Sequence, residues 1–336
     1  MKFPVFLWIG LLTVLPLGAA SHIVLAHRGA SAYLPEHSLA AKAVAQVQGA
    51  DFVEQDLVLT KDGVPIVLHD IHLDTTTDVA QRFPDRKRAD GRYYAIDFTL
   101  AEVKQLQAVP RFDPKTHRAA YPNRFPRNGY TYPLHTFEEE ILFLQGLGVS
   151  TGRPVGLYTE IKQPTFHHAE GQDITRIVVD ILKRHGYGLR KDEACWIQCF
   201  EATTLKRLRT EFGWQGNLMM ILGGNKPGAD GTDYDAFSQP DGMKQVRTFA
   251  DAIGPGIGRV VSWDRNGQLH VSDFTRNAHA AGLQVHWGVV RRDDLPDHCP
   301  SLDALHAALF DAAGSEGGFT DFPDLTVQWL KDHRLR

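Results

Sequence analysis

Residues 23–57, IVLAHRGASAYLPEHSLAAKAVAQVQGADFVEQDL, predict a strand, a helix and a second strand in close succession. Short apolar runs cover residues 23–26 and 52–57, and residues 38–48 between them carry apolar side chains at helical spacing. A strand that is followed by a helix and another strand is the unit of a parallel sheet. No glycine-rich phosphate loop follows the first strand, which disfavours a doubly wound nucleotide-binding sheet.

The same alternation continues along the rest of the chain. Six further strands are expected at residues 155–161, 195–200, 217–222, 259–263, 283–287 and 317–320. The helices expected between and after them cover residues 136–146, 173–185, 202–211, 244–252, 272–281, 302–312 and 324–331. Eight strand–helix units in a chain of 336 residues predict an α/β protein with a (β/α)8 TIM barrel, and an open doubly wound sheet is the alternative.

Two segments interrupt this alternation. Residues 64–68, which follow Gly63, predict a hairpin return from the second strand. Residues 71–133 are rich in Arg, Tyr, Pro and Gly and are too long for an ordinary loop, so they predict an insertion that lies over one face of the barrel. Residues 223–243 form a second, looser insertion. The basic side chains early in the long insertion are expected to be solvated rather than to line the entrance, and they are Arg82, Arg86, Lys87, Arg88 and Arg92.

Residues 1–20 have the layout of a secretory signal peptide. Lys2 gives a positive start, residues 3–17 are apolar, and residues 18–20 (Gly-Ala-Ala) supply the small side chains of a cleavage site. An uncleaved membrane anchor is the alternative, but the apolar stretch is shorter than the roughly 20 residues of a spanning helix. We therefore expect a periplasmic or secreted protein with no stable membrane insertion after cleavage, and a single catalytic domain at residues 21–336.

The composition excludes several classes of function. Lys and Arg together number 36 and Asp and Glu number 40, which gives a formal charge of −4 and no basic run that a nucleic-acid partner would require. Three cysteines are too few for a disulfide scaffold or a Cys-rich zinc module.

Polar side chains gather at the C-terminal ends of the expected strands, where TIM barrels hold their active sites. They are His27 and Arg28 after the first strand, Glu54 and Asp56 on the second, His69 after its hairpin return, and Glu160 and Lys162 on the third. Glu54 and Asp56 are two residues apart, so both point to the same face of their strand. Two such carboxylates repel each other unless a cation neutralises them. Glu160 completes an all-oxygen cluster that suits Ca²⁺ or Mg²⁺ better than Zn²⁺.

The other members of this set predict phosphate chemistry. Arg28 and Lys162 are cations that suit a phosphate group, and His27 and His69 can transfer protons. Each residue alone is more often structural, since the chain has 16 histidines. Their combination predicts metal-assisted cleavage of a phosphodiester.

The spacing of these residues resembles the pattern of the glycerophosphodiester phosphodiesterase family. The matching motifs are H-R-G at 27–29, P-E-H-S at 35–38, E-Q-D at 54–56, K-D-G at 61–63, H-D at 69–70, the helix start LHTFEEEI at 134–141, E-I-K at 160–162 and T-D-F-P at 320–323. The chain is most similar to the exported bacterial members. The segments that carry this similarity are RFPDRKRADGRYYAIDFTL (82–100), FHHAEGQD (166–173) and DAIGPG (251–256).

The resemblance implies a TIM barrel, a divalent metal ion, typically Ca²⁺ in the exported branch, and release of sn-glycerol 3-phosphate from deacylated phospholipids. Glycerophosphocholine and glycerophosphoethanolamine are the substrates it implies, and a homodimer is compatible with it. The site residues it implies are the metal ligands Glu54, Asp56 and Glu160, the acid–base pair His27 and His69, and the phosphate-binding Arg28 and Lys162. Which histidine is the acid stays open, as does the nucleophile, which is either water or a glycerol hydroxyl of the substrate.

The seventh expected strand departs from the family pattern. The family places an aromatic residue at the position that Gly288 holds here, and Trp287 stands one residue earlier. Because a shift of one residue turns a side chain to the opposite face of a strand, either a bulge brings Trp287 into the site or the aromatic platform for glycerol is missing. Trp287, Phe200 and Trp263 are candidate substrate contacts, and packing in the core is the alternative for each.

Three rival functions compete with this interpretation. A phospholipase D-like or other phosphodiesterase of the same superfamily would keep the fold, but a lipase would expose an apolar loop where the long insertion is polar. A surface protein that only binds a host molecule would not need its catalytic residues, but every expected catalytic position is filled in this chain. A glycosidase would explain the paired carboxylates but would leave Arg28, Lys162 and the histidines without a role.

Overall fold

The computed structural model describes residues 22–191 and 194–336. The segment expected to be a signal peptide, residues 1–20, lies outside the described residues. None of the helices in the described part of the chain has the length and apolar content that crossing a bilayer requires.

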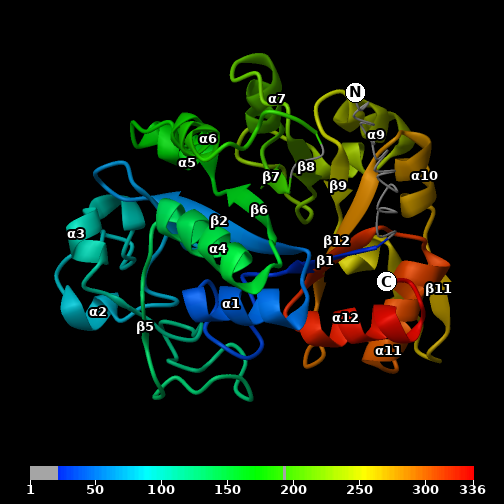
Figure 1. Cartoon of the computed structure of the whole chain (residues 1–336), viewed down its shortest axis with the longest axis horizontal. Helices are drawn as coiled ribbons and strands as arrows, with labels where there is room; N and C mark the ends of the chain where they lie inside the picture. Colours follow the sequence, from blue (N-terminus) through cyan, green and yellow to red (C-terminus); the bar gives the residue numbers. More distant parts are fainter. Residues whose placement is uncertain (1–21, 192–193) are drawn as a thin grey trace, which may run out of the picture.

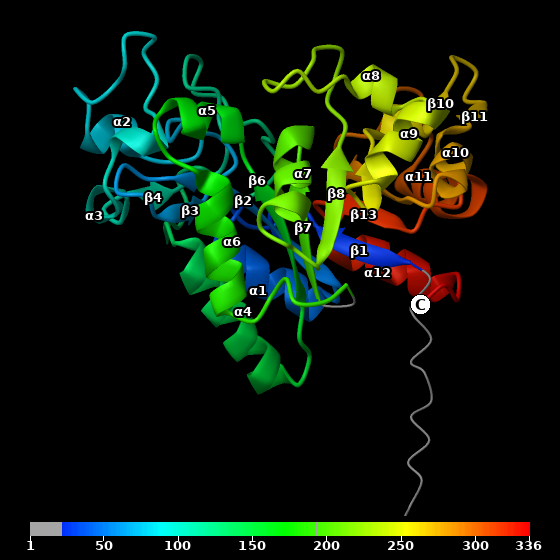
Figure 2. The ribbon, with the colours of Figure 1, turned by 90° about the horizontal axis from the view of Figure 1, so that it is seen from above.

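A closed barrel of eight parallel strands forms the centre of the molecule (Figure 1, Figure 2). In order around the ring the strands are β1 (Ile23–Ala26), β2 (Phe52–Leu59), β6 (Gly156–Ile161), β7 (Cys195–Cys199), β8 (Asn217–Ile221), β9 (Ala252–Gly254), β12 (Gln284–Val290) and β13 (Gly317–Thr320). β1 pairs with β2 on one side and with β13 on the other, which closes the ring. The hairpin strand β3 (Pro65–Val67) runs antiparallel to β2. The predicted TIM barrel and hairpin return are confirmed.

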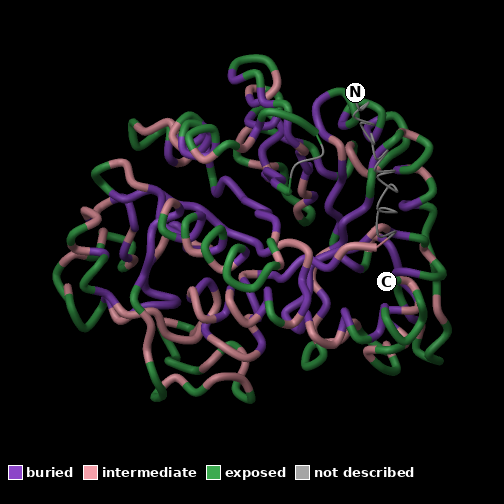
Figure 3. Tube along the Cα trace, viewed as in Figure 1, coloured by how far each residue is buried: buried purple, intermediate pink, exposed green. Residues whose placement is uncertain are grey.

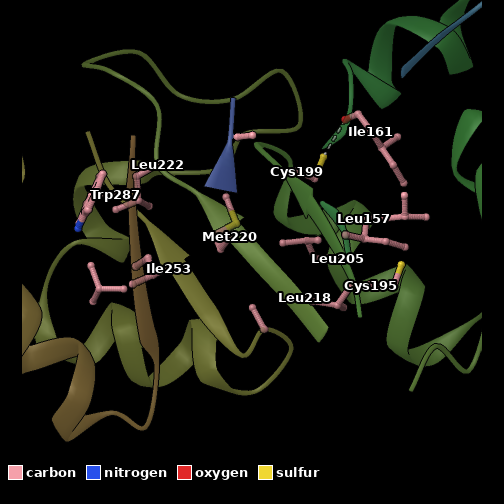
Figure 4. Close-up of a cluster of buried hydrophobic side chains, with 14 of the residues drawn as sticks. Leu157, Ile161, Cys195, Cys199, Leu205, Leu218, Met220, Leu222, Ile253 and Trp287 are labelled. Atoms are coloured by element: carbon pink, nitrogen blue, oxygen red, sulfur yellow. Dashed lines mark hydrogen bonds between the residues drawn. The ribbon is translucent and has the colours of Figure 1, made fainter. Parts of the chain in front are cut away.

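Helices surround the barrel and bury their inner faces against it (Figure 3). They are α1 (Leu39–Gln48), α4 (Phe137–Thr151), α5 (Pro164–Ala169), α6 (Ile174–Arg184), α7 (Ala202–Thr210), α8 (Tyr234–Phe237), α9 (Pro240–Arg247), α10 (Phe274–Ala280), α11 (Leu302–Ala307) and α12 (Pro323–Asp332). Figure 4 shows part of the apolar layer, in which Leu157 and Leu218 from the strands belong to one cluster with Leu205 of α7. Tyr158 and Met219, the next residues along these strands, belong to a separate cluster inside the barrel.

The capping of α1 fixes the segment that follows β1. The Ser38 hydroxyl accepts the backbone N–H of Ala41 at the start of the helix. Gly49 ends the helix in the left-handed region, with a φ of 103°. Because the backbone N–H of His37 also donates to the carbonyl of Arg28, the loop between β1 and α1 is held against the end of the first strand.

The sixth strand of the barrel differs from the prediction. Residues 259–263 were expected to form it, but β10 (Val261–Trp263) pairs with β11 (Leu269–Val271) in a separate antiparallel hairpin. The barrel strand is β9 (Ala252–Gly254), which begins at the last residue of the expected helix 244–252. β9 is too short and contains too little apolar area to stand out in the sequence, whereas the valines before Trp263 form an apolar run.

A second, smaller difference concerns the helix expected at residues 302–312. α11 ends at Ala307, and the chain continues as one wide π-helical stretch, Ala308–Ala312. The apolar periodicity of the two parts is nearly the same, so the change in winding leaves little trace in the sequence.

The long insertion packs on the β2–β3 hairpin. Its elements are α2 (Val79–Arg82), a 3₁₀ turn (Ala95–Asp97), α3 (Leu100–Val103), β4 (Gln107–Ala108) and β5 (Tyr132–Pro133). Leu73, Phe98 and Leu106 form an apolar cluster with Val58 of β2 and Ile66 of β3. Figure 2 shows the helices α2 and α3 on one side of the barrel, opposite the β10–β11 hairpin.

The basic side chains early in the insertion form local ion pairs. Arg86 pairs with Glu102 and Arg92 pairs with Asp74, and all four of these residues belong to the insertion. Arg88 binds Asp97 through two nitrogens and also reaches Glu170 beyond the insertion. None of these arginines lines a cavity at the carboxyl ends of the strands.

We expect Gly317→Ala to destabilise the barrel. A Cβ at Gly317 would lie 2.1 Å from the carbonyl oxygen of Ile23 on the paired strand, so β1 and β13 would have to move apart. The free energy of unfolding should fall by about 2 kcal/mol or more.

The matched control is Gly146→Ala in the exposed middle of α4, where a Cβ has open space. Because alanine favours the helix, this variant should gain up to about 1 kcal/mol. Equilibrium unfolding in urea measures both variants, and an unchanged midpoint for Gly317→Ala would contradict the close approach of the two strands.

Candidate functional site

Three carboxylates meet at the mouth of the barrel, the rim formed by the carboxyl ends of the strands. Glu54 and Asp56 come from β2, and Glu160 comes from the neighbouring strand β6, where it is paired in register with Asp56. All three are buried, and one oxygen atom of each lies within 4.8 Å of the others. The structure therefore brings together the three residues that the sequence predicted as a metal site.

The surroundings of these carboxylates fit a divalent cation. Asp56 Oδ1 is buried and has no hydrogen-bond partner, so its lone pairs are available to a ligand. Burial and the charge of Asp56 raise the pKa of Glu54 well above its ordinary value. Burial also raises the pKa of Glu160 to about 8, because the attraction of Lys162 does not compensate for it. Such carboxylates need a neutralising charge, and an all-oxygen donor set suits Ca²⁺ or Mg²⁺.

His27 lies beside this cluster and is fixed by Asp321, which follows β13. The two side chains approach to 2.6 Å between His27 Nδ1 and Asp321 Oδ1. Burial raises the pKa of Asp321, but His27 and two arginines outweigh it and hold the pKa below its usual range. A carboxylate has no proton to donate, so Nδ1–H of His27 is the donor. His27 Nε2 lies 3.8 Å from Glu54 Oε2 and faces the carboxylate cluster.

His69, which follows β3, has the same arrangement. Its Nδ1 lies 2.6 Å from Oδ1 of the adjacent Asp70. Burial lowers the pKa of His69 to about 3, and the positive charges of Arg28 and Lys162 act in the same direction. Burial also lowers the pKa of His27 to about 4. Both imidazoles are therefore neutral at pH 7, with one nitrogen bound to a carboxylate and the other facing the mouth.

Arg28 and Lys162 lie between the histidines and the carboxylates. Arg28 donates from Nη1 to Glu36 Oε1 at 2.9 Å, and its Nε lies 3.5 Å from Asp56 Oδ2. Lys162 Nζ lies 2.7 Å from Glu160 Oε1. Glu36 of the P-E-H-S motif thus holds Arg28 rather than His27. An anionic group bound at the carboxylate cluster would therefore contact both cations.

Two cavities meet at His27, Arg28 and His69. The outer cavity has a volume of about 280 Å³, and its remaining wall includes residues of the long insertion, which are Pro110, Arg111, Tyr121, Arg124 and Phe125. The inner cavity, of about 250 Å³, reaches the carboxylates and has an apolar wall of Phe200, Met219, Ile221, Leu222, Val289 and Phe319. A diester whose central group lies at the junction could extend one arm into each cavity.

Of the predicted aromatic contacts, Phe200 lies at the site and Trp287 does not. Phe200 lines the inner cavity, and its ring centre is 5.6 Å from Lys162 Nζ. Trp287 is fully buried among apolar side chains on the other side of β12 (Figure 4). It packs edge-to-face on Phe310. A register irregularity follows Trp287, but it brings Gly288 rather than the indole to the cavity.

The expectation that Trp287 contacts substrate is therefore corrected. Successive residues of a strand point to opposite faces, and the irregularity begins one residue too late to turn the indole inward. Trp263 is also absent from the site, because its strand β10 belongs to the outer hairpin.

Sequence reasoning missed three arginines and left one aspartate without a role. Asp321 belongs to the T-D-F-P motif, so the sequence marked it as a residue of the family pattern. Nothing in the sequence indicated that it would contact His27. Arg111 and Arg124 lie in irregular parts of the insertion, and Arg291 follows β12, where no motif distinguishes them from other charged residues. All three line the outer cavity.

Comparisons with known proteins point to one family. The family model of the glycerophosphoryl diester phosphodiesterases matches residues 27–325. A glycerophosphodiester phosphodiesterase of Haemophilus influenzae is 40% identical, over 92% of this chain and 90% of that protein. One of Treponema pallidum is 37% identical, over 97% of both chains.

A solved structure supports the fold independently. The phosphodiesterase of Oleispira antarctica, in complex with the product sn-glycerol-3-phosphate, has a TM-score of 0.59 at 21% identity, covering 92% of this chain and 96% of its own. The family match spans the barrel from His27 to beyond Asp321 and so contains every residue of the site described above. The chain belongs to the glycerophosphoryl diester phosphodiesterase family of enzymes.

Proposed function

We propose that this enzyme hydrolyses glycerophosphodiesters, such as glycerophosphocholine and glycerophosphoethanolamine, to sn-glycerol 3-phosphate and an alcohol, and that it depends on a divalent metal ion. The observation that carries the proposal is the pair of histidines, each bound to an aspartate, which line one cavity together with a buried cluster of three carboxylates. The complex of the Oleispira antarctica enzyme with sn-glycerol-3-phosphate supports the same product for this chain.

The residues divide into three roles in this proposal. Glu54, Asp56 and Glu160 hold the ion, for which Ca²⁺ is expected and Mg²⁺ is the alternative. When bound, the ion withdraws charge from the phosphate oxygens and stabilises the charge that builds on them in the transition state. Arg28 and Lys162, which lie beside these carboxylates, would bind the phosphate.

The two histidines supply the proton transfers. One imidazole, neutral, takes a proton from the nucleophile at Nε2. The other is protonated at Nε2 when the anionic phosphate is bound beside it, and it gives that proton to the departing alcohol. Asp321 and Asp70 keep the second nitrogen of His27 and His69 occupied, so that Nε2 of each ring is the atom that exchanges a proton with the substrate. Phe200 is proposed to contact the arm of the substrate that enters the inner cavity.

We also propose that the enzyme is exported. The apolar residues 3–17 after Lys2 and the small residues 18–20 support a signal peptide that is cleaved after Ala20. The mature enzyme would then act in the periplasm or outside the cell.

Release of glycerol 3-phosphate tests the enzymatic proposal directly. We expect the purified chain to release it from both glycerophosphocholine and glycerophosphoethanolamine, and chelation to lower the rate at least about 100-fold. Added Ca²⁺ should restore the rate, and a parallel titration with Mg²⁺ identifies the preferred ion. The coupled assay with glycerol-3-phosphate dehydrogenase measures the product. Absence of product with either ion, from a folded sample, would contradict the proposed function.

A further inference from the structure

The long insertion sends one arginine to each of the two histidine–aspartate pairs. Arg124 Nη1 donates to Asp321 Oδ2 at 2.8 Å, while Oδ1 of the same carboxylate binds His27. Arg291 donates to Asp321 Oδ2 at the same distance. Arg124 is itself fixed by two hydrogen bonds to Asp293, and its side chain is only 9% exposed.

The second pair repeats this arrangement. Arg111 Nη1 donates to Asp70 Oδ2 at 2.6 Å, while Asp70 Oδ1 binds His69. The remaining nitrogens of Arg111 bind both oxygens of Glu36, which in turn accepts from Arg28. Arg111 therefore supports a histidine and the candidate phosphate-binding arginine at once.

These contacts determine how the imidazoles are oriented. A carboxylate that is bound through one oxygen alone can rotate about its own bond and carry the ring with it. Bonds on the other oxygen restrict that freedom: Arg124 and Arg291 hold Oδ2 of Asp321, and Arg111 and Thr75 hold Oδ2 of Asp70. Each guanidinium also neutralises a charge that is costly to bury. Partners of this kind fix the orientation and tautomer of a working histidine.

We propose that the insertion completes the active site, and that Arg124 and Arg111 are positioning residues that act through Asp321 on His27 and through Asp70 on His69. The inference rests on the proposed function. It gives the insertion a catalytic role beyond covering one side of the mouth. Arg88 belongs to the same insertion and binds Asp97 and Glu170 with comparable geometry, but neither carboxylate is hydrogen-bonded to a histidine within the described residues.

A double-mutant cycle separates positioning from direct contact with the substrate. The variants are Arg124→Gln, Asp321→Asn and the two combined, assayed with Ca²⁺ on glycerophosphocholine. We expect Arg124→Gln to lower kcat between about 10- and 100-fold and to change KM less than about 3-fold. In the Asp321→Asn background the same change should alter kcat less than about 3-fold, because the residue it acts through is already disabled. The parallel cycle uses Arg111→Gln and Asp70→Asn.

Further variants distinguish a loss of positioning from a loss of folding. Arg124→Lys retains the charge but loses the fork of donors, so it should recover part of the kcat that Arg124→Gln loses. Arg88→Gln removes an ion-paired arginine of the insertion and should leave kcat unchanged. Thermal unfolding of every variant, with and without Ca²⁺, shows whether the barrel is intact.

A substrate with a good leaving group adds a readout that a structural role would not move. The nitrophenyl ester of glycerol 3-phosphate needs no proton on its departing oxygen. With this substrate, the fall in kcat caused by the arginine variant at the pair that serves as the acid should shrink at least about 10-fold. The fall in kcat caused by the arginine variant at the other pair should remain.

Two results would overturn the inference. The first is a full, independent loss from Arg124→Gln in the Asp321→Asn background, which would mean that Arg124 acts elsewhere. The second is a rise in KM at constant kcat, which would make Arg124 a substrate contact. An inactive wild-type enzyme would contradict the proposed function instead, whereas an active wild type with unaffected arginine variants would contradict only the role of the insertion.

Discussion

His27→Asn and His69→Asn are each expected to lower kcat at least about 100-fold. The amide of asparagine can still donate to Asp321 or Asp70, so the carboxylate keeps a partner and the fold is preserved. The variants lose the ring nitrogen that faces the mouth, which is the atom that would exchange a proton with the substrate. Steady-state rates of glycerol 3-phosphate release, measured with saturating Ca²⁺, give the change in kcat.

The control for these variants is His270→Asn. His270 lies on β11 of the outer hairpin with 56% of its side chain exposed, so the same substitution there should leave kcat unchanged. If both active-site variants kept near-normal rates, the assignment of His27 and His69 as acid and base would be wrong.

Glu160→Gln is expected to weaken the binding of Ca²⁺ at least about 100-fold and to remove most of the activity. The change keeps the size of the side chain but replaces one of the three charged ligands by an amide, which holds a hard cation less strongly. Isothermal titration calorimetry of the protein without substrate measures the affinity independently of the reaction.

Thermal unfolding offers a second readout for the same variant. A ligand that binds the folded state alone stabilises it by about 2.7 kcal/mol at 100 times its Kd. Ca²⁺ should therefore raise the Tm of the wild type, and the same concentration should leave Glu160→Gln nearly unchanged. The control is Asp241→Asn, which removes a charge from a side chain that is 89% exposed. An equal rise in Tm for the wild type and Glu160→Gln would contradict the metal site.

The barrel could be predicted from the sequence because most of its strands are apolar runs followed by amphipathic helices. The first strand (Ile23–Ala26) and the last (Gly317–Thr320) have the predicted boundaries. β9 could not be found in this way, since its three residues, Ala252–Gly254, bury little area and owe their conformation to the neighbouring strands β8 and β12. Tertiary contacts, rather than local preference, determine so short a strand.

The centre of the site could be predicted for a related reason. Parallel strands in a barrel end at one rim, so polar residues after different strands, such as Asp56 and Glu160, must converge. Trp287 illustrates the limit of this argument, because whether its side chain points inward depends on where a single irregularity in β12 begins.

Arg111 and Arg124 illustrate a different limit. They reach the mouth through pairings that span 41 residues to Asp70 and 197 residues to Asp321, within a segment that has little regular structure. No periodicity relates such positions to the barrel, and a charged residue in a polar loop is most often solvated.

The pairing of β1 with β13 has a consequence for when the enzyme becomes active during its synthesis. His27 is made among the first residues of the barrel, but Asp321 follows the last strand and reaches His27 only when β13 docks beside β1. A ribosome that adds about 5–20 residues per second needs many seconds to cover that interval. Throughout it the nascent chain carries an unanchored imidazole and cannot hydrolyse diesters efficiently. With His27 in its proposed role, we expect catalysis to be delayed until the ring has closed, and a chain that stops before β13 to remain inert however well its earlier strands have folded.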